Sequence, residues 1–167
     1  MTIYSLSTIS VLYHFTDRRN LEAIRQHGGL HSFAQLKARG IQIPAPGGNQ
    51  WSWDADEAKG MGGYVHLCFR SSHPMEHTAR QDGRIENSVF LEIDPSVLQF
   101  PEVRFTPDVS NKSGVSSVPI AEAIIDYEVI YTRTDWANPT IKARLDQAEK
   151  CEVLVPSFIP LKYIRNL

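Results

Sequence analysis

Glu152 is the residue whose type and position best suit chemistry. It opens an otherwise apolar run, Glu152–Val155, whose residue types predict a strand. Because strand side chains alternate, Glu152 shares a face with Leu154, and we expect it to lie half-buried at the rim of the core. A carboxylate there is costly unless it has a partner or a chemical role. The alternative is a solvated edge residue, and composition alone favours that alternative.

Histidines are the second group that could carry chemistry. His14 lies in a strand-like run with Thr16 just after it, but a single strand histidine is more often structural than functional. His73 and His77 have i,i+4 spacing, yet no glutamate and no third ligand stand at metalloprotease spacing. We therefore expect a polar loop around these two residues and no bound metal.

The first half of the chain contains one well-defined structural unit. Residues 11–15 are aromatic and branched, which predicts a strand. Asp17 is suited to cap a short helix whose apolar pair is Leu21 and Ile24. Gly28 and the glycine after it should end that helix. From residue 30 to residue 63 the pattern is weak, and a loop this long in a small domain is usually functional or partly disordered.

Strands dominate the second half, with few helices that could connect parallel strands. This favours an α+β fold over a doubly wound parallel sheet. The expected strands are 64–69, 89–93, 128–131, 152–155 and 163–164; the expected helix is 141–150, and the expected loops are 107–117 and 135–140.

Composition sets broad limits on the class of protein. The length of 167 residues suits a single domain, 1–167. The formal net charge of −2 gives no overall polycation, so nucleic-acid binding would need a local basic groove. Both cysteines, Cys68 and Cys151, lie in apolar runs where buried reduced thiols are usual. No apolar run is long enough to span a bilayer and no secretory signal is visible, so we expect a cytoplasmic protein without membrane contact.

Three ordered blocks of the sequence carry its most specific pattern. The first block is Leu12-Tyr13-His14-Phe15-Thr16, followed by Asn20-Leu21, Ile24 and His27-Gly28-Gly29-Leu30. The second is Tyr64-Val65-His66-Leu67-Cys68-Phe69 with His73-Pro74-Met75. The third is Gln147-Ala148-Glu149, Cys151 to Val155 and Ile159-Pro160. Together these three blocks resemble the DarT toxins, bacterial ADP-ribosyltransferases that modify bases of single-stranded DNA. The resemblance implies an ADP-ribosyltransferase fold with two packed, mostly antiparallel sheets and a few helices.

The resemblance also implies residue roles. Glu152 would be the catalytic glutamate, which stabilises positive charge on the ribose as the nicotinamide bond breaks and accepts a proton from the attacking base. NAD, the co-substrate, would be bound by a pocket that comprises His14, Phe15, Thr16, Asn20, Gly29, Leu30 and Tyr64. The implied partners are single-stranded DNA and a cognate antitoxin.

The middle of the chain departs from the family pattern. Thymine-directed members carry an arginine-rich segment after the first helix, whereas Ala34–Gly60 contains only Arg39. Arg39 is therefore the candidate for contacting the NAD diphosphate or stabilising the departing charge. Trp51 and Trp53 stand in this segment, either as core anchors or as a surface on which bases stack. This leaves the target base open between guanine and thymine.

Two other functions fit the same residues. The chain could ADP-ribosylate RNA or protein, because one scaffold serves many acceptors. It could also bind NAD or ADP-ribose without turnover.

For the DNA reaction, we expect the acceptor strand to contact residues 107–117 and 135–150. Trp136 would then be either a stacking surface or a loop anchor.

Overall fold

The computed structural model describes residues 4–46, 60–132 and 135–167, and within them the chain is α+β as expected. The helices are α1 (Leu21–Gln26), α2 (Phe33–Arg39), α4 (Pro74–Gln81), α5 (Tyr127–Tyr131) and α6 (Pro139–Lys150). The strands are β1 (Leu12–Asp17), β2 (Gly29–His31), β3 (Tyr64–Leu67), β4 (Ser88–Ile93), β5 (Arg104–Thr106), β6 (Val118–Pro119), β7 (Glu152–Pro156) and β8 (Phe158–Pro160).

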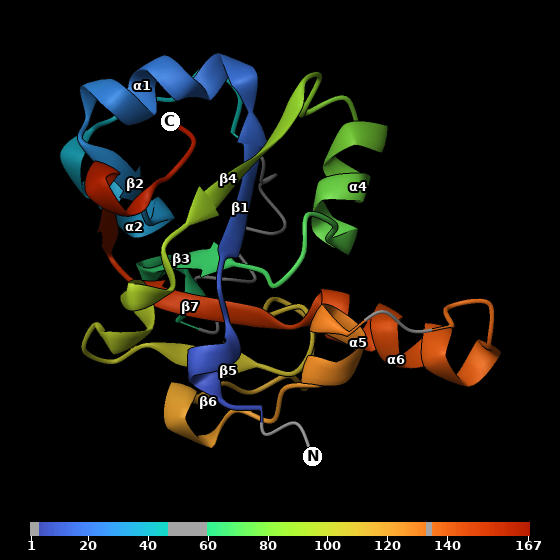
Figure 1. Cartoon of the computed structure of the whole chain (residues 1–167). Coiled ribbons are helices and arrows are strands. Elements are labelled where there is room, and N and C mark those ends of the chain that lie inside the picture. Colours follow the sequence, from blue (N-terminus) through green and yellow to red (C-terminus); the bar gives the residue numbers. More distant parts are fainter. Residues whose placement is uncertain (1–3, 47–59, 133–134) are drawn as a thin grey trace.

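These strands pair antiparallel in three small sheets. The orders are β1-β4, β2-β8 and β3-β7-β5-β6. An isolated bridge between Tyr13 and Cys68 ties β1 to the chain just after β3. Figure 1 shows the long β1-β4 pair in the upper half of the molecule and the β3-β7-β5-β6 sheet in the lower half. The expected mostly antiparallel pairing is therefore confirmed, with the strands divided among three sheets.

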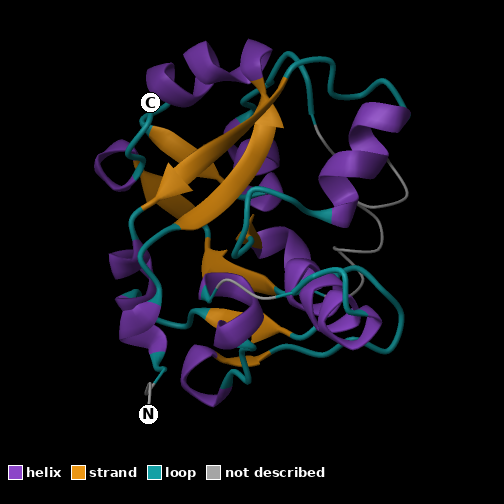
Figure 2. Ribbon diagram, turned by 45° about the vertical axis from the view of Figure 1, so that its right-hand side comes forward, coloured by secondary structure: helices purple, strands orange, loops and turns teal. Residues whose placement is uncertain are grey.

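Strand β7 runs through the middle of the core. Val153, Leu154 and Val155 have no exposed surface, because β3 and β5 flank the strand and side chains cover both of its faces. Burying one such aliphatic side chain contributes about 1.5–3 kcal/mol. Helices α5 and α6 lie beside one end of β7. Helix α1 lies at the upper end of the β1-β4 pair (labelled in Figure 1, turned in Figure 2). Glu152 is thus the first residue of the most buried strand.

The predicted strand, capped helix and glycine pair are confirmed. Asp17 ends β1, and its side chain accepts a hydrogen bond from the Arg19 amide at the start of a 3-10 turn that leads into α1. Gly28 has a φ of 81° after the helix ends. Gly29 begins β2, where a Cβ atom would lie 2.1 Å from the Ile159 carbonyl oxygen. Only glycine allows β2 and β8 to approach this closely.

The predicted strand at residues 128–131 is wrong, because this segment is helix α5. Val129 is fully buried and packs against Leu145 and Ala148 of α6, forming a second, small core. Arg144 of α6 donates two hydrogen bonds of 2.8 Å to the Asp126 carboxylate just before α5. A short run of branched and aromatic residues fits either a strand or a buried helix, and the contact with α6 decides between them.

Other predicted boundaries also need correction. The expected polar loop around His73 and His77 is helix α4, with His73 as N-cap and Pro74 in its first turn. The strand expected at 163–164 is wrong, because residues 161–163 form a 3-10 turn. The last strand is β8, which ends at Pro160. Helix α2 lies in the segment where the pattern was weak, and Ser32 caps it by accepting a hydrogen bond from the Gln35 amide.

Three remaining expectations concern loops, thiols and membranes. The helix predicted at 141–150 and the loop at 107–117 are confirmed, and both cysteines are free and buried. Trp51 and Trp53 lie outside the described residues. Within the ranges that the structure describes, no helix has the length and apolar character needed to cross a bilayer.

Candidate active site

Glu152 is buried rather than half-buried, with 5% of its surface exposed. Both carboxylate oxygens have partners: Oε1 lies 3.0 Å from His66 Nδ1, and Oε2 accepts a 2.6 Å hydrogen bond from the Ser110 amide. Burial raises the pKa of Glu152, but the hydrogen bond and charge of His66, the field of His73 and the Ser110 amide together outweigh burial. The net pKa lies below the usual glutamate value, so the carboxylate is ionised at neutral pH.

His66 connects this carboxylate to three other parts of the chain. Its Nε2 lies 3.1 Å from the Met61 carbonyl oxygen, and its Nδ1 also lies 3.0 Å from Ser110 Oγ. Its own carbonyl oxygen accepts a 2.9 Å hydrogen bond from His14 Nδ1. Strand β3 places His66 here because Val65 and Leu67, its alternating neighbours, are buried on the opposite face. We call His66, Ser110 and Glu152 the carboxylate cluster.

A pocket next to β1 contains five of the seven predicted NAD-binding residues. His14, Thr16, Asn20, Gly29 and Leu30 line it. Further lining comes from Ala23, Ile24, His27, His31, Leu36, Ile41 and Ile43, so most of its wall is apolar. Strand β1, helix α1 and the Gly28-Gly29 turn bring these residues together, and a mostly apolar wall with a few polar groups is typical of ligand pockets.

His14 is the polar group of this pocket whose protonation state is best defined. Burial lowers the pKa of His14, so its imidazole is neutral at neutral pH. Because Nδ1 donates to the His66 carbonyl oxygen, the remaining nitrogen, Nε2, carries a lone pair. His14 therefore offers the pocket a hydrogen-bond acceptor.

Asn20 has a structural role that the sequence did not indicate. Its Oδ1 accepts a 2.8 Å hydrogen bond from the Ala45 amide, while its Nδ2 donates to the Ala45 carbonyl at 2.7 Å and to Thr16 Oγ1 at 3.0 Å. Both amide hydrogens and the amide oxygen thus have partners within the protein. Asn20 lines the pocket by fixing the segment around Ala45 against the end of β1.

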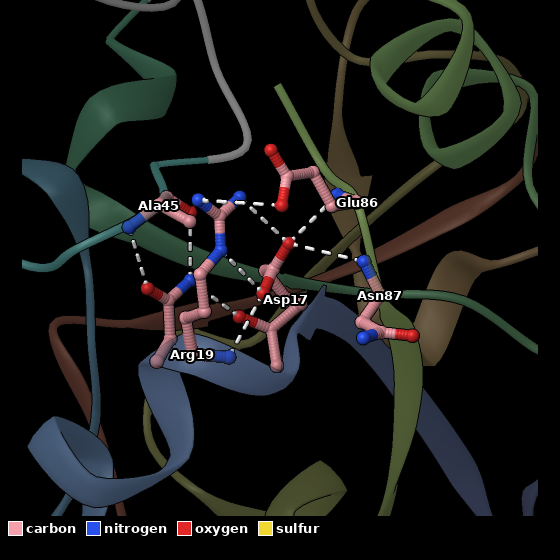
Figure 3. Close-up of polar contacts among 7 residues, drawn as sticks. Asp17, Arg19, Ala45, Glu86 and Asn87 are labelled. Atoms are coloured by element: carbon pink, nitrogen blue, oxygen red, sulfur yellow. Dashed lines mark hydrogen bonds and ion pairs between the residues drawn. The ribbon is translucent and has the colours of Figure 1, made fainter. Parts of the chain in front are cut away.

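Asp17 fixes the same corner of the molecule through its buried carboxylate. Five N–H groups donate to it: the Arg19 amide, Nε and Nη2, and the amides of Glu86 and Asn87 (Figure 3). The pKa of Asp17 lies well below its usual value, mainly because the carboxylate is hydrogen-bonded to the Arg19 side chain. Burial acts in the opposite direction and raises this pKa, but its effect is smaller. The network joins the end of β1 to the segment that enters β4.

Three predicted residues do not line the pocket. Phe15 stacks instead on His73, with ring centroids 5.8 Å apart. Tyr64 is half-buried at the start of β3 opposite Pro156. Arg39 is exposed at the end of α2 and has no contact with the carboxylate cluster among the described residues.

Next to the carboxylate cluster lies a buried histidine without an assigned role. His73 Nδ1 accepts a hydrogen bond from the Met75 amide, and Nε2 has no hydrogen-bond partner. Burial lowers the pKa of His73, and the field of Glu152 partly opposes that shift. Across residues 4–46, 60–132 and 135–167, no group of three or more His, Cys, Asp or Glu side chains is arranged to hold a metal ion.

Trp136 is the one tryptophan within the described ranges. It is 39% exposed, and the Arg70 guanidinium lies 4.9 Å from its ring centroid. Arg70 also donates a 3.2 Å hydrogen bond to Glu149. The ring is therefore contacted by one cation and presents surface to solvent, and base stacking on it stays a prediction.

The fold is shared with solved structures of ADP-ribosyltransferases. Thermus sp. 2.9 DarT in complex with ADP-ribosylated ssDNA aligns with a TM-score of 0.66 and 19% sequence identity, over 94% of this chain and 79% of that chain. The same DarT in complex with NAD+ gives a TM-score of 0.61 and 21% identity, over 94% and 80%. Thermosipho africanus DarTG in complex with ADP-ribose gives 0.69 and 14%, over 93% of this chain and 42% of that chain. The chain therefore has the fold of these DarT structures.

A family model narrows the class. The model described as ssDNA thymidine ADP-ribosyltransferase, DarT, matches residues 13–167. The chain belongs to the DarT family, and the predicted resemblance is confirmed. No curated protein sequence matches the chain at a significant level.

Sequence reasoning missed two members of the carboxylate cluster, His66 and Ser110. Strand alternation does place His66 on the face opposite Val65 and Leu67. A histidine in this position of an apolar strand indicates that its ring contacts a polar group. Ser110 stands in a polar loop without any distinguishing pattern. Its contact with Glu152 joins residues 42 positions apart and depends on how the loop folds over β7.

Proposed function

We propose that this chain transfers ADP-ribose from NAD to a base of single-stranded DNA, with Glu152 as the catalytic carboxylate. One observation carries the proposal: a buried, ionised carboxylate stands at the head of β7, linked through His66 to the pocket residue His14. Membership of the DarT family supports both the NAD chemistry and the DNA acceptor.

The chemistry requires a negative charge beside the ribose. NAD supplies an ADP-ribosyl group whose bond to nicotinamide breaks with its electron pair leaving on nicotinamide, so positive charge develops at the ribose carbon. Glu152 stabilises that charge, and the buried surroundings strengthen the interaction. When a ring nitrogen of the acceptor base attacks the same carbon, Glu152 takes the proton that this nitrogen loses.

The pocket beside β1 suits the rest of NAD. Neutral His14 accepts a hydrogen bond through Nε2 from a ribose hydroxyl, and Gly29 allows a close approach to the backbone. Leu30 supplies apolar contact. Arg39 remains the candidate for the diphosphate, since Leu36, one helical turn before it on α2, lines the pocket.

The acceptor strand would lie on the opposite side of the carboxylate cluster. Ser110, in the loop 107–117, already touches Glu152, and helix α6 leads directly into β7. Trp136 and Arg70 offer an aromatic face and a cation at the start of this region. Stacking on such a face contributes about 1–3 kcal/mol per base. Following the family description, we propose thymine as the base, with guanine as the alternative.

Oligonucleotides of defined base content test this proposal directly. The protein is incubated with NAD and with strands that each contain one thymine or one guanine in an otherwise identical background, and the products are examined by mass spectrometry. We expect one added ADP-ribose on the thymine strand. Glu152→Gln keeps the side-chain shape but removes the negative charge, and should lower the rate by at least about a hundredfold. Glu86→Gln, at an exposed carboxylate, should match wild type.

The outcomes separate the alternatives. Modification of RNA or protein instead of DNA would replace the proposed acceptor, and NAD binding without nicotinamide release would make the chain a binding module. An adduct on the guanine strand would change only the base. The cognate antitoxin is tested in bacterial cells: expression of wild type should arrest growth, Glu152→Gln should not, and a gene that restores growth with wild type is the antitoxin candidate.

A further inference from the structure

His66 lies between two hydrogen-bond acceptors. Its Nε2 is 3.1 Å from the Met61 carbonyl oxygen, which can only accept. Its Nδ1 is 3.0 Å from Glu152 Oε1, which also only accepts while the glutamate is ionised. A neutral imidazole has one N–H group and would leave one of these contacts without a hydrogen. The doubly protonated imidazolium donates to both acceptors at once.

Ser110 provides a partner for the other protonation state. Its hydroxyl oxygen lies 3.0 Å from His66 Nδ1, and its amide holds Glu152 Oε2 at 2.6 Å. If Nδ1 loses its proton, the Ser110 hydroxyl can donate to the resulting lone pair while Nε2–H stays on Met61. Glu152 Oε1 then loses its donor, but Oε2 keeps the Ser110 amide. The cluster thus has two hydrogen-bonded states that differ by one proton and in the availability of Oε1.

We propose that His66 is a positioning residue that controls the catalytic glutamate: the imidazolium occupies Glu152 Oε1, and the neutral imidazole releases that oxygen for the substrate. This inference rests on the proposed function of Glu152. It adds a proton-linked step, because an oxygen that accepts a hydrogen bond from an imidazolium is a weaker acceptor for a ribose hydroxyl and a weaker base for the proton of the acceptor base.

The charged groups around His66 set the direction of the pH effect. Glu152 from β7 favours the imidazolium. His14 from β1 and His73 at the N-cap of α4 would oppose it if charged, but burial lowers the pKa of both and so favours their neutral forms. His66 therefore gains its proton as pH falls, and transfer to DNA should slow on the acid side.

A pH profile of the transfer rate tests the proposal. For a single controlling proton, the wild-type rate should rise between roughly pH 5 and pH 8, by up to about tenfold per pH unit, and then level off. His66→Asn has no titratable group, so its profile should be flat to within about twofold over the same range. His77→Asn, on the exposed side of α4, is the matched control and should keep the wild-type profile. A His66→Asn profile with the wild-type slope would overturn the proposal.

Imidazole nitrogen NMR provides a second test that needs no turnover. In wild type without NAD, His66 should change from imidazolium to the neutral form with its proton on Nε2. Ser110→Ala removes the donor to the neutral form and should move this midpoint to higher pH, whereas Glu152→Gln should move it to lower pH. A neutral ring with its proton on Nδ1 throughout would overturn the inference. If wild type transfers nothing to any acceptor, the proposed function fails, and these spectra still decide the role of His66.

Discussion

Replacing Asp17 with asparagine tests the network that holds the end of β1. The wild-type carboxylate accepts five hydrogen bonds, two on Oδ1 from Arg19 and three on Oδ2 from Arg19, Glu86 and Asn87. Asparagine has one oxygen and one NH2 group in the same space. In its better orientation the amide oxygen takes the Oδ2 position, and the NH2 group then faces the Arg19 amide and Nε, which are also donors.

The magnitude follows from counting these contacts. Two hydrogen bonds are lost in the better orientation, one of them from a cation, and the remaining three lose the charge of their acceptor. With about 1.5–3 kcal/mol for a charged hydrogen bond and roughly 1–3 kcal/mol for a buried donor left unsatisfied, Asp17→Asn should cost about 3–5 kcal/mol. Domains of this kind have a total stability of about 5–15 kcal/mol, so the variant should be strongly destabilised.

Urea unfolding followed by circular dichroism measures this loss, and the melting temperature should fall by roughly 10 °C. Asp82→Asn is the matched control, since Asp82 also binds an arginine two residues away but is half-exposed. It should change the free energy of unfolding by less than about 1 kcal/mol. A similar effect of both substitutions, or a loss below about 1 kcal/mol for Asp17→Asn, would refute the hydrogen-bond count.

The same network predicts acid sensitivity. Because the folded pKa of Asp17 is depressed, its contribution to stability is present above its unfolded pKa, about 3.9, and is lost as pH falls through the folded value. The free energy of unfolding of wild type should therefore fall below about pH 4 relative to that of Asp17→Asn. Parallel pH dependences for the two proteins would contradict this assignment.

Three further substitutions or treatments have defined outcomes. Gly29→Ala should separate β2 from β8 and reduce soluble yield and melting temperature, whereas Gly62→Ala, where a Cβ atom meets nothing within 4 Å, should behave as wild type. Asn20→Ala should lower the free energy of unfolding by about 2–3 kcal/mol in urea, because it leaves buried backbone groups without partners; an unchanged midpoint would contradict this. Burial raises the pKa of Cys151 to about 12 and that of Cys68 as well, so neither thiol should react with iodoacetamide near pH 8 unless the protein is unfolded, as mass spectrometry would show.

The predictions that held in the fold depended on local signals. Asp17 caps the 3-10 turn that leads into α1, and Gly28 takes a positive φ after that helix; capping and backbone freedom are both local effects. The segments that were mispredicted, 128–131 and 163–164, are short and apolar, so the sequence allows more than one backbone state. For α5 the choice is made by packing on α6, which lies beyond the range of any local pattern.

The carboxylate cluster shows the same division. The sequence pattern showed Glu152 as a charged residue at the head of an apolar strand, which by itself favoured a solvated edge residue, and the resemblance to the DarT toxins implied its catalytic role. The resemblance also implied seven pocket residues, of which five, all between positions 14 and 31, line the observed pocket. It did not identify Asn20 as the residue that fixes Ala45, which is a contact across 25 positions.

Only the tertiary structure decided how Glu152 is held. The antiparallel pairing of β3 with β7 brings His66 next to a carboxylate 86 positions away, and the loop 107–117 adds Ser110 to the same carboxylate. Strand register and loop closure are set by the whole core, so a single sequence does not reveal them. The sequence determined which groups are available for chemistry, and the pairing of strands far apart in the chain determined that an imidazole would share the glutamate.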